Sequence, residues 1–280
     1  MPLDSSKRGM EITGIRGQKA RTVQFPGRQL MDNGSNKRDD ETLDSLTCRG
    51  LSVLQKKQGY RYSLDAYLLA AFVDEKPGTG VIDIGSGSGV VSLLLAAEKG
   101  LTVTGVEIQD AIAEMSRRSV EIAGLQERVK IVCADIREYG SSGQADVIVT
   151  NPPYRPARSG RINADQSKAL ARHEISLDLE ALLERSYALL KPGGRFYLVY
   201  PAWRLPDLMS AMRKFRIEPK RIMLVHSTMQ SSAEICLVCG LKEGGKELVV
   251  LSPFIVFAQE GIYTTEMEGV FRNLSLPKSH

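Results

Sequence analysis

The sequence predicts an α/β fold built around a mostly parallel sheet, and two observations support this. Short apolar runs, such as residues 81–84 and 145–150, alternate with longer helical segments along most of the chain. A loop with glycine at every second position, residues 85–89, follows the first of these runs and opens a helix. Strands that alternate with helices form a parallel sheet that is covered on both faces.

The elements follow in a regular order. The core pattern predicts strands at residues 81–84, 101–106, 129–133, 145–150 and 196–200, and helices at 90–99, 111–123, 177–190 and 205–215. Before it we expect a hairpin with arms 51–55 and 59–63, then a buried helix at 66–73 with Ser63 or Asp65 as its N-cap. Residues 221–226 and 235–241 should pair antiparallel, because only a polar connection separates them. The hydrophobic run at residues 248–257 predicts an edge strand or a flap over the site.

Composition favours a cytosolic protein. The 280 residues are 42% hydrophobic and 25% charged, which is typical of globular proteins. No run approaches the roughly 20 apolar residues of a membrane span. The four cysteines are scattered, so neither a disulfide framework nor a metal site is expected. Cys236 and Cys239 fall on opposite faces of a predicted strand, which favours two small buried side chains.

The first 28 residues have six basic residues and two acidic ones, with few large apolar side chains. We expect residues 1–42 to form a basic, disordered tail, residues 43–260 the main domain, and residues 261–280 a C-terminal extension. The basic tail could follow a phosphate backbone. A tail that is merely solvated fits the composition equally well.

The glycine loop has the chemistry of a cofactor site. Gly85, Gly87 and Gly89 let the backbone approach a ligand closely, with helix N–H groups aimed at it. The spacing differs from that of nicotinamide binders, and no Gly-Lys-Ser/Thr of a P-loop is present. Asp83, just before the loop, suits a cationic amino group better than a pyrophosphate. A nucleoside cofactor without phosphate therefore fits best.

Two further predicted strand ends bear acids. Glu107 lies where a carboxylate can accept both ribose hydroxyls of a nucleotide. Asp135 can accept from an adenine amino group, and Ile136 can cover the ring. A single acid of this kind is more often a surface loop residue, but three successive strand ends favour a site.

The fourth strand of the alternating series ends at Asn151-Pro152-Pro153-Tyr154. The two prolines forbid a helix and make a stiff turn. The turn offers a side-chain amide, carbonyls and an aromatic ring to a flat substrate that has an NH2 group. Taken alone, it could equally be an ordinary turn at a strand end.

Together, Asp83, the three glycines, Glu107, Asp135 and Asn151–Tyr154 resemble the class I S-adenosylmethionine-dependent methyltransferases. The resemblance implies a Rossmann-like sheet of seven strands in the order 3-2-1-4-5-7-6, with the last strand antiparallel. It also implies S-adenosyl-L-methionine as cofactor and a planar NH2 group as acceptor. Asn151 and Pro152 would then accept the hydrogens of that amine, and Tyr154 would stack on its ring.

The segment 58–70 is similar to the bacterial tRNA1(Val) adenine-N6-methyltransferase family, which implies tRNA as partner. Asp65 would lie near the methionyl end of the cofactor. Four arginines around and after the turn suit RNA phosphates: Arg155, Arg158, Arg161 and Arg172. The alternatives are a glutamine methyltransferase that acts on a release factor or ribosomal protein, a ribosomal-RNA guanine-N2 methyltransferase, and a non-catalytic RNA-binding module.

Overall fold

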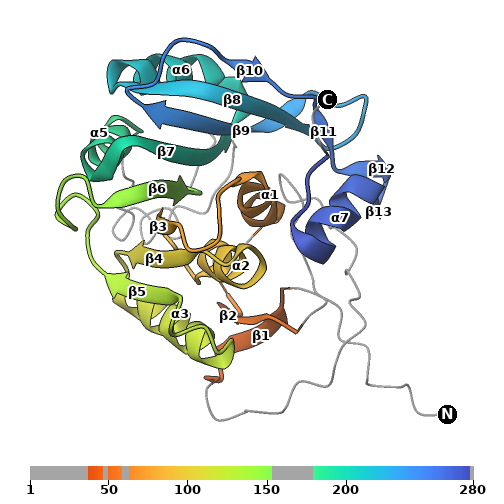
Figure 1. The fold of residues 1–280 in the computed structure, drawn as a ribbon. Coiled ribbons are helices and arrows are strands. Elements are labelled where there is room, and N and C mark those ends of the chain that lie inside the picture. Colours follow the sequence, from red (N-terminus) through yellow and green to blue (C-terminus); the bar gives the residue numbers. More distant parts are fainter. Residues whose placement is uncertain (1–36, 47–49, 59–62, 153–178, 278–280) are drawn as a thin grey trace, which may run out of the picture.

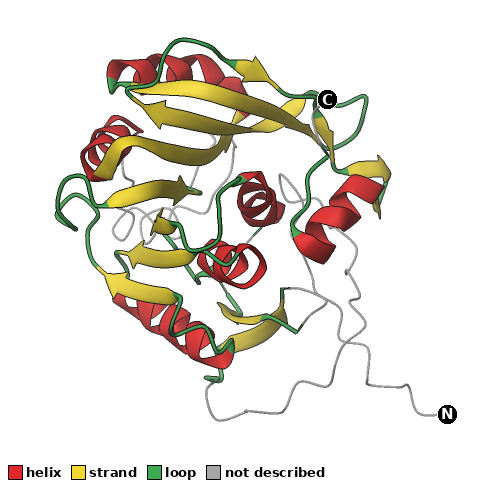
Figure 2. Ribbon diagram, viewed as in Figure 1, coloured by secondary structure: helices red, strands yellow, loops and turns green. Residues whose placement is uncertain are grey.

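The computed structural model describes residues 37–46, 50–58, 63–152 and 179–277. A nine-stranded sheet runs through the centre of this part of the chain, with helices on both faces (Figures 1 and 2). Its seven main strands are β3 (Gly80–Ile84), β4 (Thr102–Glu107), β5 (Val129–Cys133), β6 (Ala145–Thr150), β7 (Leu190–Pro201), β8 (Ile217–His226) and β9 (Ala233–Lys242).

The strand order confirms the topology predicted from the sequence. Read across the sheet, the strands run β5-β4-β3-β6-β7-β9-β8, which is the order 3-2-1-4-5-7-6. β9 is antiparallel to both of its neighbours, and the other neighbouring pairs are parallel. Two short strands, β10 (Val249–Val250) and β11 (Phe254–Ile255), pair with β8 and extend the sheet on its outer side. This agrees with the edge strand predicted for residues 248–257.

Side chains from the two faces of the sheet form two hydrophobic cores. Helices α1 (Leu64–Phe72), α2 (Val90–Lys99) and α3 (Asp110–Ile122) contribute to the first core, and α5 (Leu179–Leu189) and α6 (Leu205–Lys214) to the second. Cys236 and Cys239 are buried in different cores, which confirms their opposite orientations. Burial raises the pKa of the Cys236 thiol to about 12, so it is inert at neutral pH.

The C-terminal part of the chain packs on this framework. β12 (Phe257–Gln259) and β13 (Ile262–Tyr263) form a short antiparallel pair, followed by α7 (Thr265–Asn273). The buried Phe271 of α7 meets Tyr67 of α1 edge to face, with ring centroids 5.3 Å apart. Among the described helices, none combines the length and the apolar character that a membrane span needs.

The N-terminal hairpin is present, but its arms differ from the prediction. β2 (Ser52–Lys56) pairs antiparallel with β1 (Glu41–Ser45), upstream of it. The predicted second arm falls on residues 59–62, which lie outside the described residues, and on Ser63. Sequence reasoning missed β1 because its alternation, Glu-Thr-Leu-Asp-Ser, is acidic rather than apolar. Ser63 is the N-cap of α1, although its side chain makes no capping hydrogen bond.

The fifth predicted strand also begins earlier than expected. The Lys191-Pro192-Gly193-Gly194 segment was expected to separate the preceding helix from the strand. In the structure α5 ends at Leu189 and β7 begins at once, with a register shift against β6 that accommodates the segment.

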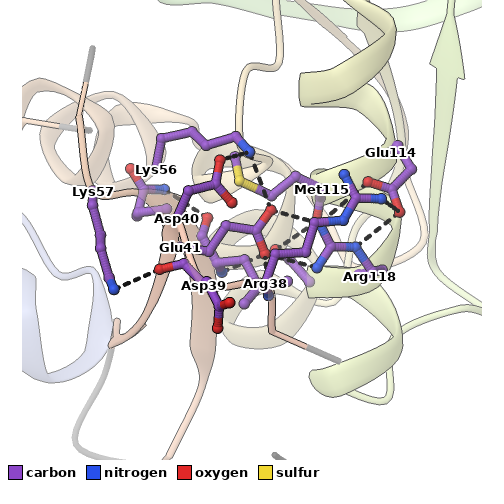
Figure 3. Close-up of polar contacts among 12 residues, drawn as sticks. Arg38, Asp39, Asp40, Glu41, Lys56, Lys57, Glu114, Met115 and Arg118 are labelled. Atoms are coloured by element: carbon purple, nitrogen blue, oxygen red, sulfur yellow. Dashed lines mark hydrogen bonds and ion pairs between the residues drawn. The ribbon is translucent and has the colours of Figure 1, made fainter. Parts of the chain in front are cut away.

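A buried ion pair fastens the hairpin to α3 (Figure 3). Arg118 donates from its two terminal nitrogens to the two carboxylate oxygens of Glu41, at 2.8 and 2.7 Å. The Arg38 backbone N–H donates to the same carboxylate at 3.0 Å, and the Glu41 side chain is fully buried. Hydrogen bonds from Arg118 lower the pKa of Glu41 to about 2. The pair therefore holds β1 and β2 against the body of the domain.

We predict that Arg118→Met lowers the free energy of unfolding by about 3 kcal/mol near neutral pH. The substitution removes both guanidinium hydrogen bonds from the buried Glu41 carboxylate and leaves it with the Arg38 N–H and the Lys56 ammonium at 3.4 Å. The pKa of Glu41 in the fold lies below its ordinary value of 4.5, so the loss should be complete above that pH and shrink as the pH falls toward about 2. Chemical denaturation at several pH values measures it.

Arg213→Met is the matched control, because Arg213 is 54% exposed in its ion pair with Glu218. It should cost less than about 1 kcal/mol. Equal losses in the two variants would contradict the role of the buried pair.

Candidate functional site

A cleft of about 300 Å³ opens at the carboxyl ends of β3, β4 and β6. It brings together five of the residues predicted for the site: Asp83, Gly85, Gly87, Glu107 and Asn151. Parallel strands end at the same edge of a sheet, and β3 lies between β4 and β6, so these three strand ends are adjacent. The topology thus explains why residues far apart in the sequence share one cleft.

The glycine loop leaves β3 in a conformation that other residues rarely adopt. Gly85, Gly87 and Gly89 have φ angles of +69°, +55° and +87°. A Cβ at Gly85 or Gly87 would meet nothing within 4 Å, so open space remains on the cleft side for a ligand. Ser86, between them, has a buried hydroxyl that makes no hydrogen bond to the described residues. This loop therefore provides both room and an unused polar group.

Glu107 holds the loop in place. Its carboxylate accepts from the Gly87 backbone N–H at 3.0 Å and from the Gln109 backbone N–H at 2.9 Å. The side chain is buried, yet it lines the cleft. A carboxylate fixed by backbone donors at the end of the second strand can accept hydroxyl hydrogens from a ribose.

Asp83 is the second carboxylate in the cleft. Only 1% of this residue is exposed, and its carboxylate accepts from the Ser92 hydroxyl at 2.6 Å. Burial raises the pKa of Asp83 to about 7, and the nearby Glu107 carboxylate contributes to the rise. A cationic ligand group would relieve both effects, because it would favour the ionised form of Asp83.

Asn151 stands directly after β6. The Thr150 hydroxyl donates to the Ile84 carbonyl at 2.9 Å and so ties the end of β6 to the start of the glycine loop. This bond holds the Asn151 amide beside the cofactor loop, and Asn151 lines the same cleft. Pro152 follows it and is partly buried. Tyr154 and the predicted phosphate contacts Arg155, Arg158, Arg161 and Arg172 lie outside the described residues.

Other predicted site residues do not line this cleft. The Asp135 carboxylate is held by the side chain of Arg137, whose hydrogen bonds lower its pKa. Ile136 is buried in the second core. Asp65 is buried at the start of α1, where burial raises its pKa to about 6, and its neighbour Ala66 reaches the cleft instead. Gly89 is the N-cap of α2 rather than a lining residue.

Sequence reasoning missed one wall of the cleft, which the hairpin supplies. Gln55, Lys56 and Gln58 line the cleft, and the Gln55 amide donates to the hydroxyl of Ser88 in the glycine loop. The Leu54 N–H of the same strand donates to Ser119 of α3 at 3.0 Å. The sequence signal was the polar Gln55-Lys56 pair that ends the apolar run of β2.

Residues of α3 and its N-terminal loop also line the cleft: Gln109, Ile112 and Met115. The cleft therefore combines two carboxylates, several side-chain amides and an apolar patch. It also contains the Lys56 ammonium, which is paired with Asp40 and Glu41. Because Lys56 already has these partners, the two carboxylates still suit a nucleoside with a cationic arm. Within the described residues, no three His, Cys, Asp or Glu side chains are grouped so that they could hold a metal ion.

We predict that Gly89→Ala is less stable than Gly85→Ala, although both glycines have a left-handed backbone conformation. A Cβ at Gly89 would come within 2.4 Å of the Ser116 hydroxyl, whereas one at Gly85 meets nothing. Gly85→Ala should cost about 1–2 kcal/mol of unfolding free energy from backbone strain. Gly89→Ala should cost about 1–3 kcal/mol more from the clash.

Ser116→Ala supplies the control, because its buried hydroxyl has no hydrogen-bond partner in the described part of the chain. Adding it to Gly89→Ala should recover most of the extra loss, as measured by thermal and chemical denaturation. If the double variant is no more stable than Gly89→Ala, the packing explanation is wrong.

Comparison with known proteins agrees with this geometry. A protein from Porphyromonas gingivalis with the name tRNA1(Val) (adenine(37)-N6)-methyltransferase is 32% identical over 194 residues, which cover 66% of this chain and 75% of that protein. A protein of the same name from Pedobacter heparinus is 27% identical, over 77% of this chain and 91% of its own length.

Solved structures share the fold. A crystal structure described as a predicted O-methyltransferase from Agrobacterium tumefaciens matches with a TM-score of 0.62 and 21% identity, over 76% of this chain and 98% of that one. Pyrococcus horikoshii TYW2 in complex with MeSAdo matches with a TM-score of 0.53 and 14% identity, over 74% and 73%. The family model of the methyltransferase small domain matches residues 63–214, which include β3, β4, β6 and the glycine loop. The chain therefore belongs to the methyltransferase small domain family.

Proposed function

We propose that this protein transfers a methyl group from S-adenosyl-L-methionine to the exocyclic N6 amine of an adenine in tRNA. The observation that supports this most strongly is the single cleft that contains both a cofactor-type carboxylate pair, Asp83 and Glu107, and the Asn151 amide. The shared name of the relatives from Porphyromonas gingivalis and Pedobacter heparinus favours adenine in tRNA over a glutamine or guanine acceptor.

Asp83 and Glu107 hold the two polar ends of the cofactor in this proposal. Asp83, at the buried end, accepts from the methionyl amino group, and Glu107 accepts from the ribose hydroxyls. Gly85 and Gly87 let the backbone lie against the ligand. When bound, the cofactor supplies an electrophilic methyl group on a sulfonium. Asp65, Asp135 and Ile136 remain proposed contacts. To accept a hydrogen bond from the adenine amine, the Asp135 carboxylate would have to give up its hydrogen bonds from Arg137.

Asn151 and Pro152 act on the acceptor. The lone pair of an exocyclic amine is delocalised into the ring, so the amine is a poor nucleophile. The Asn151 side-chain oxygen and the Pro152 carbonyl accept its two hydrogens, which lets the nitrogen pyramidalise and direct its lone pair at the methyl carbon. The new N–C bond would form as the S–CH3 bond breaks, with S-adenosylhomocysteine leaving as a neutral thioether. The methylated nitrogen would then be cationic and would lose its proton to water, so positioning and electrostatics replace a strong general base.

The acceptor base has to leave its stack to reach the cleft. Tyr154 is proposed to stack on the base, and Arg155, Arg158, Arg161 and Arg172 to contact phosphates of the RNA. The basic segment before residue 42 is a further proposed phosphate contact. We expect the enzyme to act in the cytosol, where it meets its tRNA substrate.

Methyl transfer to tRNA tests this proposal. We predict that the protein incorporates labelled methyl from S-adenosylmethionine into tRNA that lacks the modification, and that nucleoside mass spectrometry identifies N6-methyladenosine. Asn151→Ala should lower turnover about a hundredfold or more, because the amine loses its acceptor. Its affinity for S-adenosylhomocysteine should stay within about twofold of wild type, since Asn151 is assigned to the acceptor.

Asn273→Ala, at the exposed end of α7, is the matched control and should keep full activity. Label in a release factor or ribosomal protein, with none in tRNA, would favour the glutamine alternative. Loss of cofactor binding in Asn151→Ala would contradict the role given to Asn151.

A further inference from the structure

Trp203 lies exposed just after the carboxyl end of β7, at the same end of the sheet as the strand ends that form the cleft. It is the only tryptophan in the chain, and 54% of it is exposed. It belongs to the short helix η3 (Ala202–Arg204), which directly follows β7. β7 is the neighbour of β6, and Leu198 pairs with Thr150, so the strand that leads to Trp203 leaves the sheet beside the one that leads to Asn151.

The ring is supported from within the protein. The Arg204 guanidinium lies 5.9 Å from the centre of the Trp203 ring and 5.3 Å from that of the buried Tyr200. Arg204 also reaches Asp207 of α6 at 3.5 Å, which limits its freedom. Cation–aromatic contacts of this kind stabilise an exposed ring and bring positive charge next to it.

Among the described residues at this end of the sheet, the turn between β8 and β9 is mostly polar. η3 contacts β9, and the turn between β8 and β9 presents Thr228, Gln230 and Ser232, with Met229 73% exposed among them. The turn is held by Ser231, whose carbonyl lies 2.7 Å from a ring nitrogen of His226 and whose hydroxyl accepts from the Thr228 N–H. A protein partner would be expected to meet a larger continuous apolar patch. A single aromatic face with a cation and polar neighbours fits a nucleic-acid base better.

We propose that Trp203 is a stacking site for an unpaired nucleotide of the RNA substrate, next to the target adenine, with Arg204 as its support. Moving the target base into the cleft exposes the faces of the bases beside it. An exposed indole at the same sheet edge can cover one of them, and stacking of this kind does not depend on base identity. This inference rests on the proposed function, because it assigns the face of the protein that its RNA approaches.

Trp203 itself reports the interaction, because all tryptophan emission comes from it. We predict that an RNA hairpin with the anticodon-arm sequence of tRNA1(Val) quenches this emission saturably, with S-adenosylhomocysteine present. A fully paired RNA duplex of the same length should quench it far less, since its bases have no uncovered faces. Emission that stays unchanged while the hairpin saturates the protein would overturn the proposal.

Substitution gives the second readout. Trp203→Ala should weaken hairpin binding about tenfold in an anisotropy assay with labelled RNA, and raise KM more than it lowers kcat. Trp203→Phe, which keeps an aromatic face, should stay within about threefold of wild type. Val250→Ala, at another exposed apolar position on the edge strand β10, should change neither value.

The two proposals fail in different ways. If the hairpin quenches the emission but no methyl reaches its adenine, the stacking site stands and the proposed function falls. If Trp203→Ala methylates tRNA with the KM of wild type, the function stands and the stacking site falls. Equal weakening in Trp203→Phe and Trp203→Ala would also overturn it, because it would point to a structural role.

Discussion

Two carboxylates, buried beside each other at the ends of neighbouring strands, are the constraint around which the site is built. Two backbone N–H groups donate hydrogen bonds to the Glu107 carboxylate and offset the free-energy cost of burying it. One of these N–H groups belongs to Gly87 in the cofactor loop. Asp83 has one hydroxyl donor and a pKa raised to about 7, so it lacks full compensation. A site of this kind favours a cation, because a cation reduces the repulsion between the carboxylates and offsets the cost of their desolvation.

The surrounding elements keep this pair buried at the wall of the cleft. The loop glycines adopt left-handed conformations that leave room for a ligand, and Thr150 ties the acceptor strand to the same loop. The hairpin forms another wall of the cleft with Gln55 and Lys56. The Glu41–Arg118 pair fastens this hairpin to α3. β7, which leads to Trp203, is the neighbour of β6, which leads to Asn151, so the proposed stacking site and the cleft lie at the same end of the sheet.

Much of this was accessible from the sequence, for identifiable reasons. The alternation of apolar runs and helices predicted five of the seven main strands, and two further apolar runs joined by a polar connection predicted β8 and β9. Of the acids at three strand ends, Asp83 and Glu107 line the cleft and Asp135 does not. β1 was missed because a strand held by an ion pair to a distant helix has little apolar pattern of its own. The contribution of Gln55 and Lys56 was missed for a different reason. β2 itself was expected, but only the tertiary fold brings it over the glycine loop. Exposure of Trp203 is likewise a property of the fold, which the sequence around it does not show.

The most direct test of the carboxylate site is calorimetric titration with S-adenosylhomocysteine in buffers of different ionisation enthalpy. Asp83 has a pKa of about 7 without ligand, and binding of a cationic amino group should lower it. Binding should therefore release about half a proton near pH 7 and more near pH 6, and affinity should rise with pH over this range. Asp83→Asn should bind more weakly and lose most of this proton release. Binding that is independent of pH, or proton release that persists unchanged in Asp83→Asn, would contradict the account.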